Sequence, residues 1–139
     1  MWYTEVRKET HSTKEKIWSV WINVNSWKIW DKDIEDANIY GDFMLHTQGY
    51  VKSKGSPKNK FKIIDCQENY CFTNRTVLPL CTVDFIHYLS QLEGKLIITH
   101  RIEIKGALSF LFAKLIGNGV KQGLSQSVEN LIKLVENEK

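Results

Sequence analysis

The chain has 139 residues, of which 42% are hydrophobic, and this length and composition suit one domain with a single core over residues 1–139. Its 19 basic and 16 acidic residues leave a net charge of +3 and are spread along the chain without a block. This distribution argues against a nucleic-acid-binding surface, and no run reaches the ~18 apolar residues of a membrane-spanning helix.

The N-terminus and the cysteines indicate the cellular compartment that we expect for this protein. Met1–Glu5 lacks the basic and apolar segments of a signal peptide, so we expect a cytoplasmic protein without stable membrane insertion. Cys66, Cys71 and Cys81 are an odd number and include no C-x-x-C pair, which zinc sites favour. We therefore expect reduced thiols whose role stays open, no metal and no cofactor.

The N-terminal segment predicts a strand followed by a capped helix. Tyr3–Thr10 mixes apolar and charged residues as a first strand would. Ser12 and Glu15 then form a capping box, in which the Glu15 carboxylate reaches back to the Ser12 amide. Trp18 and Trp21 lie on the apolar face of this helix, and we expect them to hold it against a sheet.

A second, shorter helical turn is predicted over Trp27–Asp31. Trp27 and Trp30 lie three residues apart on a stretch too short to have a core of its own. Large amphipathic rings there either pack in the core or form the wall at one end of a cavity. The sequence alone leaves both interpretations open.

Six more strands follow, separated by turn residues such as Gly41-Asp42, Gly55-Ser56-Pro57 and Glu93-Gly94. Consecutive strands joined by short turns pair antiparallel. The lysines around Gly55-Ser56-Pro57 indicate a solvated hairpin tip. The predicted strands are Asp36–Tyr40, Met44–Lys52, Lys60–Gln67, Tyr70–Leu78, Cys81–Gln91 and Lys95–Lys105.

The last hairpin carries the most specific prediction. If Glu93-Gly94 is its two-residue turn, the register of the two strands follows directly, and one face of the pair is apolar except for two histidines. That face should lie under the C-terminal helix. The predicted cross-strand pairs are Val83 with Ile104, Phe85 with Ile102, His87 with His100, and Leu89 with Ile98.

The opposed histidines allow three interpretations. Buried polar groups need hydrogen-bond partners, and a structural pair would have to find two. His87 and His100 could instead line a cavity and contact a ligand. A metal site is the third alternative, with His46 on the predicted third strand as a candidate ligand.

The last third, Gly106–Lys139, is predicted to be one long helix. Its two apolar stripes are rotated by about a third of a turn or more, and Gly117-Asn118-Gly119 lies between them, with Gly123 one turn on. These glycines indicate either a kink or room for another group against the sheet. A cavity is therefore expected between the sheet and Leu108–Leu124.

The first part of this helix, Ala107–Ile116, is apolar on nearly all sides. Phe110 projects away from the face that carries Leu108 and Phe112. Two explanations remain for this segment. It could cover the cavity as a lid, or it could bury Phe110 in a homodimer.

Taken in order, these segments resemble the START-like superfamily, specifically its polyketide cyclase/dehydrase branch. The resemblance covers nearly the whole chain. It implies a helix-grip fold of class α+β: a bent, seven-stranded antiparallel sheet around the C-terminal helix, with a ligand cavity between them. It implies no catalytic residues. The segments that carry it are Ser12–Trp18, Trp27–Asp31, Gly41–Phe43, Phe85–His87, Thr99–Gly106 and the long helix.

The function expected from these observations is the binding of a small hydrophobic molecule, lipid-like or aromatic and polyketide-like, with a few polar groups. The alternative is a cyclase or dehydratase that uses His87 or His100 as proton shuttle. The predicted ligand-binding residues are Trp30, Phe85, His87, Leu89, Ile98, His100, Ile102, Phe112, Ile116 and Val120.

Overall fold

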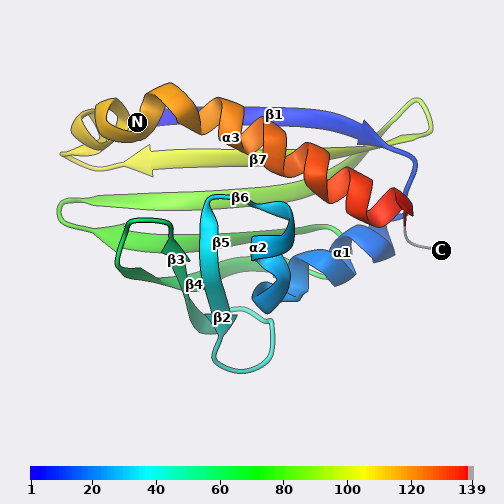
Figure 1. The fold of residues 1–139 in the computed structure, drawn as a ribbon, viewed down its shortest axis with the longest axis horizontal. Helices are drawn as coiled ribbons and strands as arrows, with labels where there is room; N and C mark the ends of the chain where they lie inside the picture. Colours follow the sequence, from blue (N-terminus) through cyan, green and yellow to red (C-terminus); the bar gives the residue numbers. More distant parts are fainter. Residues whose placement is uncertain (138–139) are drawn as a thin grey trace.

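The computed structural model describes residues 1–137, apart from the side chains of residues 115–118. Within that range, seven strands form one antiparallel sheet with the order β1-β7-β6-β5-β4-β3-β2. The long helix α3 lies across this sheet, and α1 and α2 follow the first strand (Figure 1). The predicted α+β helix-grip architecture is confirmed. The elements are β1 (Trp2–Thr10), α1 (Lys14–Ile22), the 3-10 turn η1 (Val24–Ser26), α2 (Trp27–Trp30), β2 (Ile34–Ile39), β3 (Gln48–Ser53), β4 (Lys58–Gln67), β5 (Cys71–Leu78), β6 (Cys81–Leu92), β7 (Lys95–Lys105) and α3 (Ser109–Asn137).

Helix α1 begins one residue later than the capping box predicts. Thr13, rather than Ser12, is the N-cap: its backbone is extended, and its hydroxyl oxygen accepts a hydrogen bond from the Lys16 amide at 3.3 Å. A capping box needs Glu or Gln three residues after the cap, where this chain has Lys16. The box predicted from Ser12 and Glu15 is therefore wrong, although Trp18 and Trp21 are buried as expected.

Strand β3 is shorter than predicted. Residues 44–47 form a turn in which the Thr47 amide donates to the Met44 carbonyl at 3.1 Å, and His46 has a φ of 75°, which a strand residue does not adopt. His46 is exposed in this turn, so the third ligand considered for a metal site is a surface residue. Within the described residues, no group of three or more His, Cys, Asp or Glu side chains is placed to hold a metal ion.

Helix α3 packs on the sheet through two separate hydrophobic clusters. Val128, Leu131 and Val135 are at most 1% exposed and belong to the main core, together with the aromatic side chains of α1 and α2. Phe112 packs near the start of the helix against a second cluster, which contains Cys81, Val83, Ile102 and Ile104. Phe112 therefore packs against the sheet at the start of α3, where the sequence predicts the cavity to begin.

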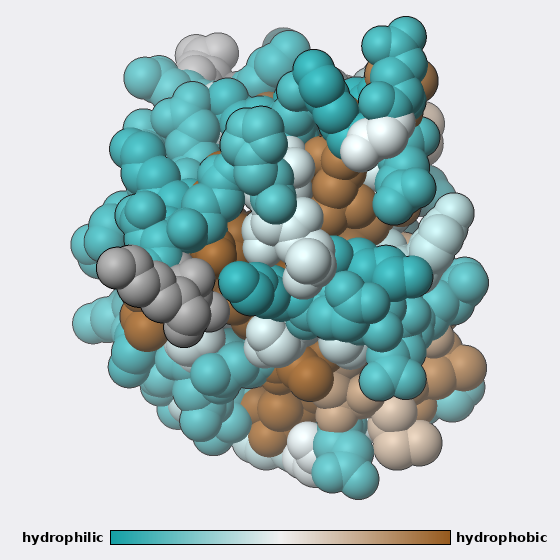
Figure 2. All heavy atoms as spheres, turned by 90° about the vertical axis from the view of Figure 1, so that its right-hand side faces the viewer, coloured by the Kyte–Doolittle hydropathy of each residue, from teal (hydrophilic) through white to brown (hydrophobic). Residues whose placement is uncertain are grey.

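The start of α3 is also the part of the helix that exposes large apolar side chains. Phe110 is 63% exposed and Leu111 42%. By contrast, the end of the molecule where α1 begins and α3 ends is mainly hydrophilic, with small hydrophobic areas between polar side chains (Figure 2). A homodimer through Phe110 stays a prediction. Among residues 1–137, no helix is both long enough and apolar enough to cross a membrane.

Candidate functional site

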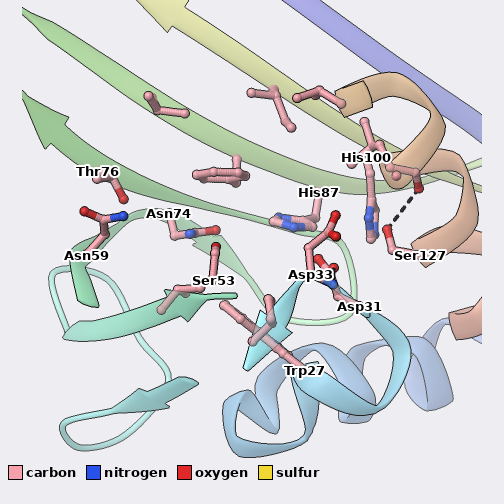
Figure 3. A pocket seen from close by; sticks show the side chains of 18 of the residues that line it. Trp27, Asp31, Asp33, Ser53, Asn59, Asn74, Thr76, His87, His100 and Ser127 are labelled. Carbon is pink, nitrogen blue, oxygen red and sulfur yellow. Dashed lines mark hydrogen bonds between the residues drawn. The ribbon is translucent and has the colours of Figure 1, made fainter. Parts of the chain in front are cut away.

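A pocket of about 340 Å³ lies between the middle of α3, the helical turn α2 and the inner face of the sheet (Figure 3). On α3 it is lined by residues of the segment Val120–Ser127, one to two turns beyond Ala107–Ile116, for which a lid was one of the two explanations. The described side chains of that part do not line it. The main apolar walls are Trp27, Trp30, Val83, Phe85, Ile102 and Val120.

The structure brings most of the predicted ligand-binding residues together. Leu89 and Ile98 are exceptions: they are 3% and 0% exposed, lie in the main core and do not line the pocket. Phe112 is a third exception, since it packs against the second cluster without lining the pocket. The side chain of Ile116 lies outside the described residues. The predicted residues that line the pocket are Trp30, Phe85, His87, His100, Ile102 and Val120.

The two histidines face each other as the hairpin register predicts. His87 pairs with His100 across β6 and β7, and the centroids of their rings are 4.6 Å apart in an edge-to-face arrangement. The ring of His87 stacks on Phe72 at 4.0 Å, with its Nδ1 3.3 Å from the Phe72 carbonyl oxygen. Nε2 of His100 accepts a hydrogen bond from the Trp21 indole N–H at 3.2 Å. Each imidazole therefore has one nitrogen held by the protein.

Burial sets the charge of this pair. It lowers the pKa of His87 to about 3, and burial together with the neighbouring His87 holds the pKa of His100 well below its ordinary value of 6.5. Both imidazoles are consequently neutral at physiological pH. A base whose pKa is this low is a poor proton acceptor near neutrality, which disfavours the histidines as a proton shuttle.

Two carboxyl groups that the sequence analysis did not single out also line the pocket. Asp31 and Asp33 follow α2, and Figure 3 shows them on the same side of the pocket as the histidines. Oδ1 of Asp31 accepts a hydrogen bond from the Asp33 amide at 3.1 Å. Burial raises the pKa of Asp31 from 3.8 to about 6, and the charge of Asp33 adds to the rise. These residues lie in a connection without periodicity, so no sequence pattern marks them.

We expect Asp31→Asn to stabilise the protein at neutral pH. A carboxyl group whose pKa is higher in the folded state costs stability once it is ionised, at 1.36 kcal/mol per pKa unit. After a discount for partial solvent access, the gain is about 1–2 kcal/mol at pH 7. Asparagine keeps the oxygen that accepts from Asp33. Urea unfolding at pH 7 and pH 4 measures the difference, which should vanish at pH 4. Asp42→Asn, at an exposed position outside the pocket, is the control, and an equal gain there would contradict the expectation.

The opposite side of the pocket carries amide and hydroxyl groups. Asn59, Asn74 and Thr76 lie there on β4 and β5 (Figure 3). Asn74 is 3% exposed, and its Oδ1 has no hydrogen-bond partner among the described residues. The same holds for the indole N–H of Trp30, which is 4% exposed. Strand alternation could have found Asn74 and Thr76, since they share the inner face of β5 with the buried Phe72.

One helical glycine makes room for a pocket residue. A Cβ at Gly123 would lie 3.1 Å from Oδ2 of Asp33, so the missing side chain lets this carboxylate approach α3 closely. A Cβ at Gly119 would meet nothing within 4 Å. Helix α3 is continuous through this region, from Ser109 to Asn137. Of the two interpretations of these glycines, Gly123 supports room for another group, and that group is the Asp33 carboxylate.

Known proteins resemble this chain in fold. No protein-family model and no curated protein matches its sequence. Protein MLL2253 from Mesorhizobium loti superposes with a TM-score of 0.78 at 12% identity over 99% of both chains. Ara h 8.0201 superposes with 0.75 at 14% identity over 99% of both chains. The di-domain ARO/CYC StfQ from the steffimycin biosynthetic pathway gives 0.78 at 6% identity, covering 96% of this chain and 50% of that one. The fold is thus the helix-grip fold predicted from the sequence.

Proposed function

We propose that this START-like domain binds one small, mainly apolar molecule in the pocket between α3 and the sheet. The observation that carries the proposal is the pocket itself: aromatic and aliphatic walls converge on a few polar groups. Its volume of about 340 Å³ lies within the range of small-molecule sites.

The structural neighbours support the general class of this proposal. StfQ is described as an ARO/CYC protein of the steffimycin biosynthetic pathway, and it shares the fold of this chain. We therefore favour an aromatic or polyketide-like ligand. Mass spectrometry of small molecules extracted from protein purified out of its native host would identify the ligand directly.

Filling the pocket should weaken ligand binding strongly. Val120 lines it from α3, and Val120→Trp would place an indole in the space that the ligand needs. We expect the affinity for N-phenyl-1-naphthylamine, a neutral apolar fluorophore, to fall at least 30-fold, about 2 kcal/mol. Fluorescence titration measures the loss, and circular dichroism confirms that the variant folds.

Val77→Trp is the matched control, because Val77 is 75% exposed and does not line the pocket. It introduces the same side chain on the surface, and we expect it to leave the affinity unchanged. A protein that fails to bind the fluorophore, or a Val120→Trp variant that binds it as well as the native chain does, would contradict the proposed function.

An acid–base enzyme is the second candidate, and the carboxyl group of Asp31 favours it. Its pKa of about 6 suits proton transfer near neutral pH, whereas the pKa of His87, at about 3, does not. If cyclisation or dehydration takes place in this pocket, Asp31 rather than either histidine would therefore transfer the proton. The histidines would then act as hydrogen-bonding groups that orient the substrate.

A further inference from the structure

The hydrogen bonds of the two histidines fix which ring nitrogen carries each proton. A carbonyl oxygen only accepts, so Nδ1 of His87, 3.3 Å from the Phe72 oxygen, carries the hydrogen and leaves Nε2 with a lone pair. An indole N–H only donates, so Nε2 of His100 has the lone pair that accepts from Trp21. The hydrogen of neutral His100 is therefore on Nδ1.

The two remaining nitrogens are free to meet a ligand. Among the described residues, the structure shows no hydrogen bond to Nε2 of His87 or to Nδ1 of His100, and neither atom is fully enclosed by the protein. Both side chains line the pocket, with ring centroids 4.6 Å apart. The pocket thus offers one acceptor and one donor next to each other, on two strands of a rigid hairpin.

The charged residues around the pocket restrict the class of ligand further. Its described lining contains the carboxyl groups of Asp31 and Asp33 but no lysine or arginine. An anionic head group, such as a carboxylate or a phosphate, would therefore enter without a cationic partner and close to like charge. Two neutral imidazoles do not offset that repulsion.

We infer that the polar group of the ligand is a neutral hydroxyl, which donates to Nε2 of His87 and accepts from the Nδ1–H of His100. A hydroxyl is the simplest group that donates and accepts through one oxygen. The inference rests on the proposed binding function and specifies its ligand class: a phenol or alcohol on an apolar body, rather than a fatty acid or another anionic lipid.

Four naphthalenes of nearly equal shape test this inference in the native protein. They are 2-naphthol, which donates and accepts; 2-methoxynaphthalene, which only accepts; 2-naphthoate, an anion; and 2-naphthylmethylamine, a cation at pH 7. Titration calorimetry at pH 7 measures all four. We expect 2-naphthol to bind about tenfold more tightly than 2-methoxynaphthalene, as one hydrogen bond predicts, and 2-naphthoate to bind most weakly.

Variants of His87 test whether the histidine causes the preference for 2-naphthol over 2-methoxynaphthalene. His87→Leu removes the acceptor and should lower 2-naphthol affinity about tenfold, to the level of 2-methoxynaphthalene, whose own affinity should stay unchanged. His87→Gln should restore selectivity, since its amide N–H can donate to the Phe72 oxygen while its carbonyl faces the pocket. His46→Gln, at an exposed position outside the pocket, is the matched control and should behave as the native chain.

The outcomes separate the inference from the proposed function. If 2-naphthol and 2-methoxynaphthalene bind equally, or if the anion or the cation binds most tightly, the inferred hydroxyl group is contradicted. The proposed binding function would still hold in that case. Binding of none of the four, together with no binding of N-phenyl-1-naphthylamine, would overturn both. If His87→Leu does not fold, the four naphthalenes with the native chain and with the His87→Gln variant still test whether the ligand carries a neutral hydroxyl.

Discussion

Replacing Gly106 with alanine is expected to destabilise the protein by about 4 kcal/mol. Gly106 joins β7 to α3 with a φ of +118°, a conformation that side chains with a Cβ rarely adopt. An added Cβ would lie 2.5 Å from the Leu80 carbonyl oxygen and 2.8 Å from Cα of Cys81, and these backbone atoms cannot move aside easily. Strain and overpacking each contribute about 2 kcal/mol. Urea unfolding of the variant measures the loss.

Gly94→Ala is the matched control for this prediction. Gly94 also has a positive φ, of 79°, but a Cβ there would meet nothing within 4 Å. We expect a loss of about 1 kcal/mol, from backbone strain alone. The difference between the two losses reports the extra backbone strain at Gly106 together with the contact between the β5–β6 turn and the start of α3, where the Leu108 amide also donates to the Leu80 carbonyl. Similar losses for the two variants would show that this close approach contributes nothing.

The hairpin of β6 and β7 shows what the sequence could predict. Glu93 and Gly94 both have positive φ, as the type I′ hairpin turn requires, and they fix the register over the whole length of both strands. Side chains alternate with a period of two, so one correct turn places every residue on the correct face. The opposition of His87 and His100 followed from this local information alone.

The position of the pocket along α3 depended on contacts that no local pattern describes. Periodicity showed that the first part of the helix is apolar, but not that Phe112 packs with Ile102 and Ile104 and helps to fill that space. The pocket forms further along, where Gly123 admits the Asp33 carboxylate. Asp31 and Asp33 lie in a loop, and the distance in sequence between that loop and α3 hides their proximity. Polar pocket residues in loops therefore required the tertiary structure.

Acid should destabilise the protein well above the pH at which ordinary carboxylates titrate. The histidine pKa values are depressed in the folded state, so below pH 6.5 the unfolded chain binds protons that the folded chain does not. Each histidine then costs 1.36 kcal/mol per pH unit as the pH falls, and this continues until the folded pKa is reached. Asp31 acts in the opposite direction, because its raised pKa makes the folded chain take up a proton near pH 6. The net loss expected from pH 7 to pH 5 is about 3 kcal/mol.

A double variant, His87→Gln with His100→Gln, assigns this loss to the pair. Glutamine does not titrate, and its amide can keep the hydrogen bonds to Trp21 and to the Phe72 carbonyl. Only the opposite contribution of Asp31 then remains between pH 7 and pH 5, so the unfolding free energy should stay level or rise slightly as the pH falls. The control is His11→Gln with His46→Gln, in which two exposed histidines change instead. We expect the His11→Gln/His46→Gln control to lose stability between pH 7 and pH 5 as the native chain does. An equally steep loss in the His87→Gln/His100→Gln variant would show that the two pocket imidazoles do not cause the loss of stability in acid.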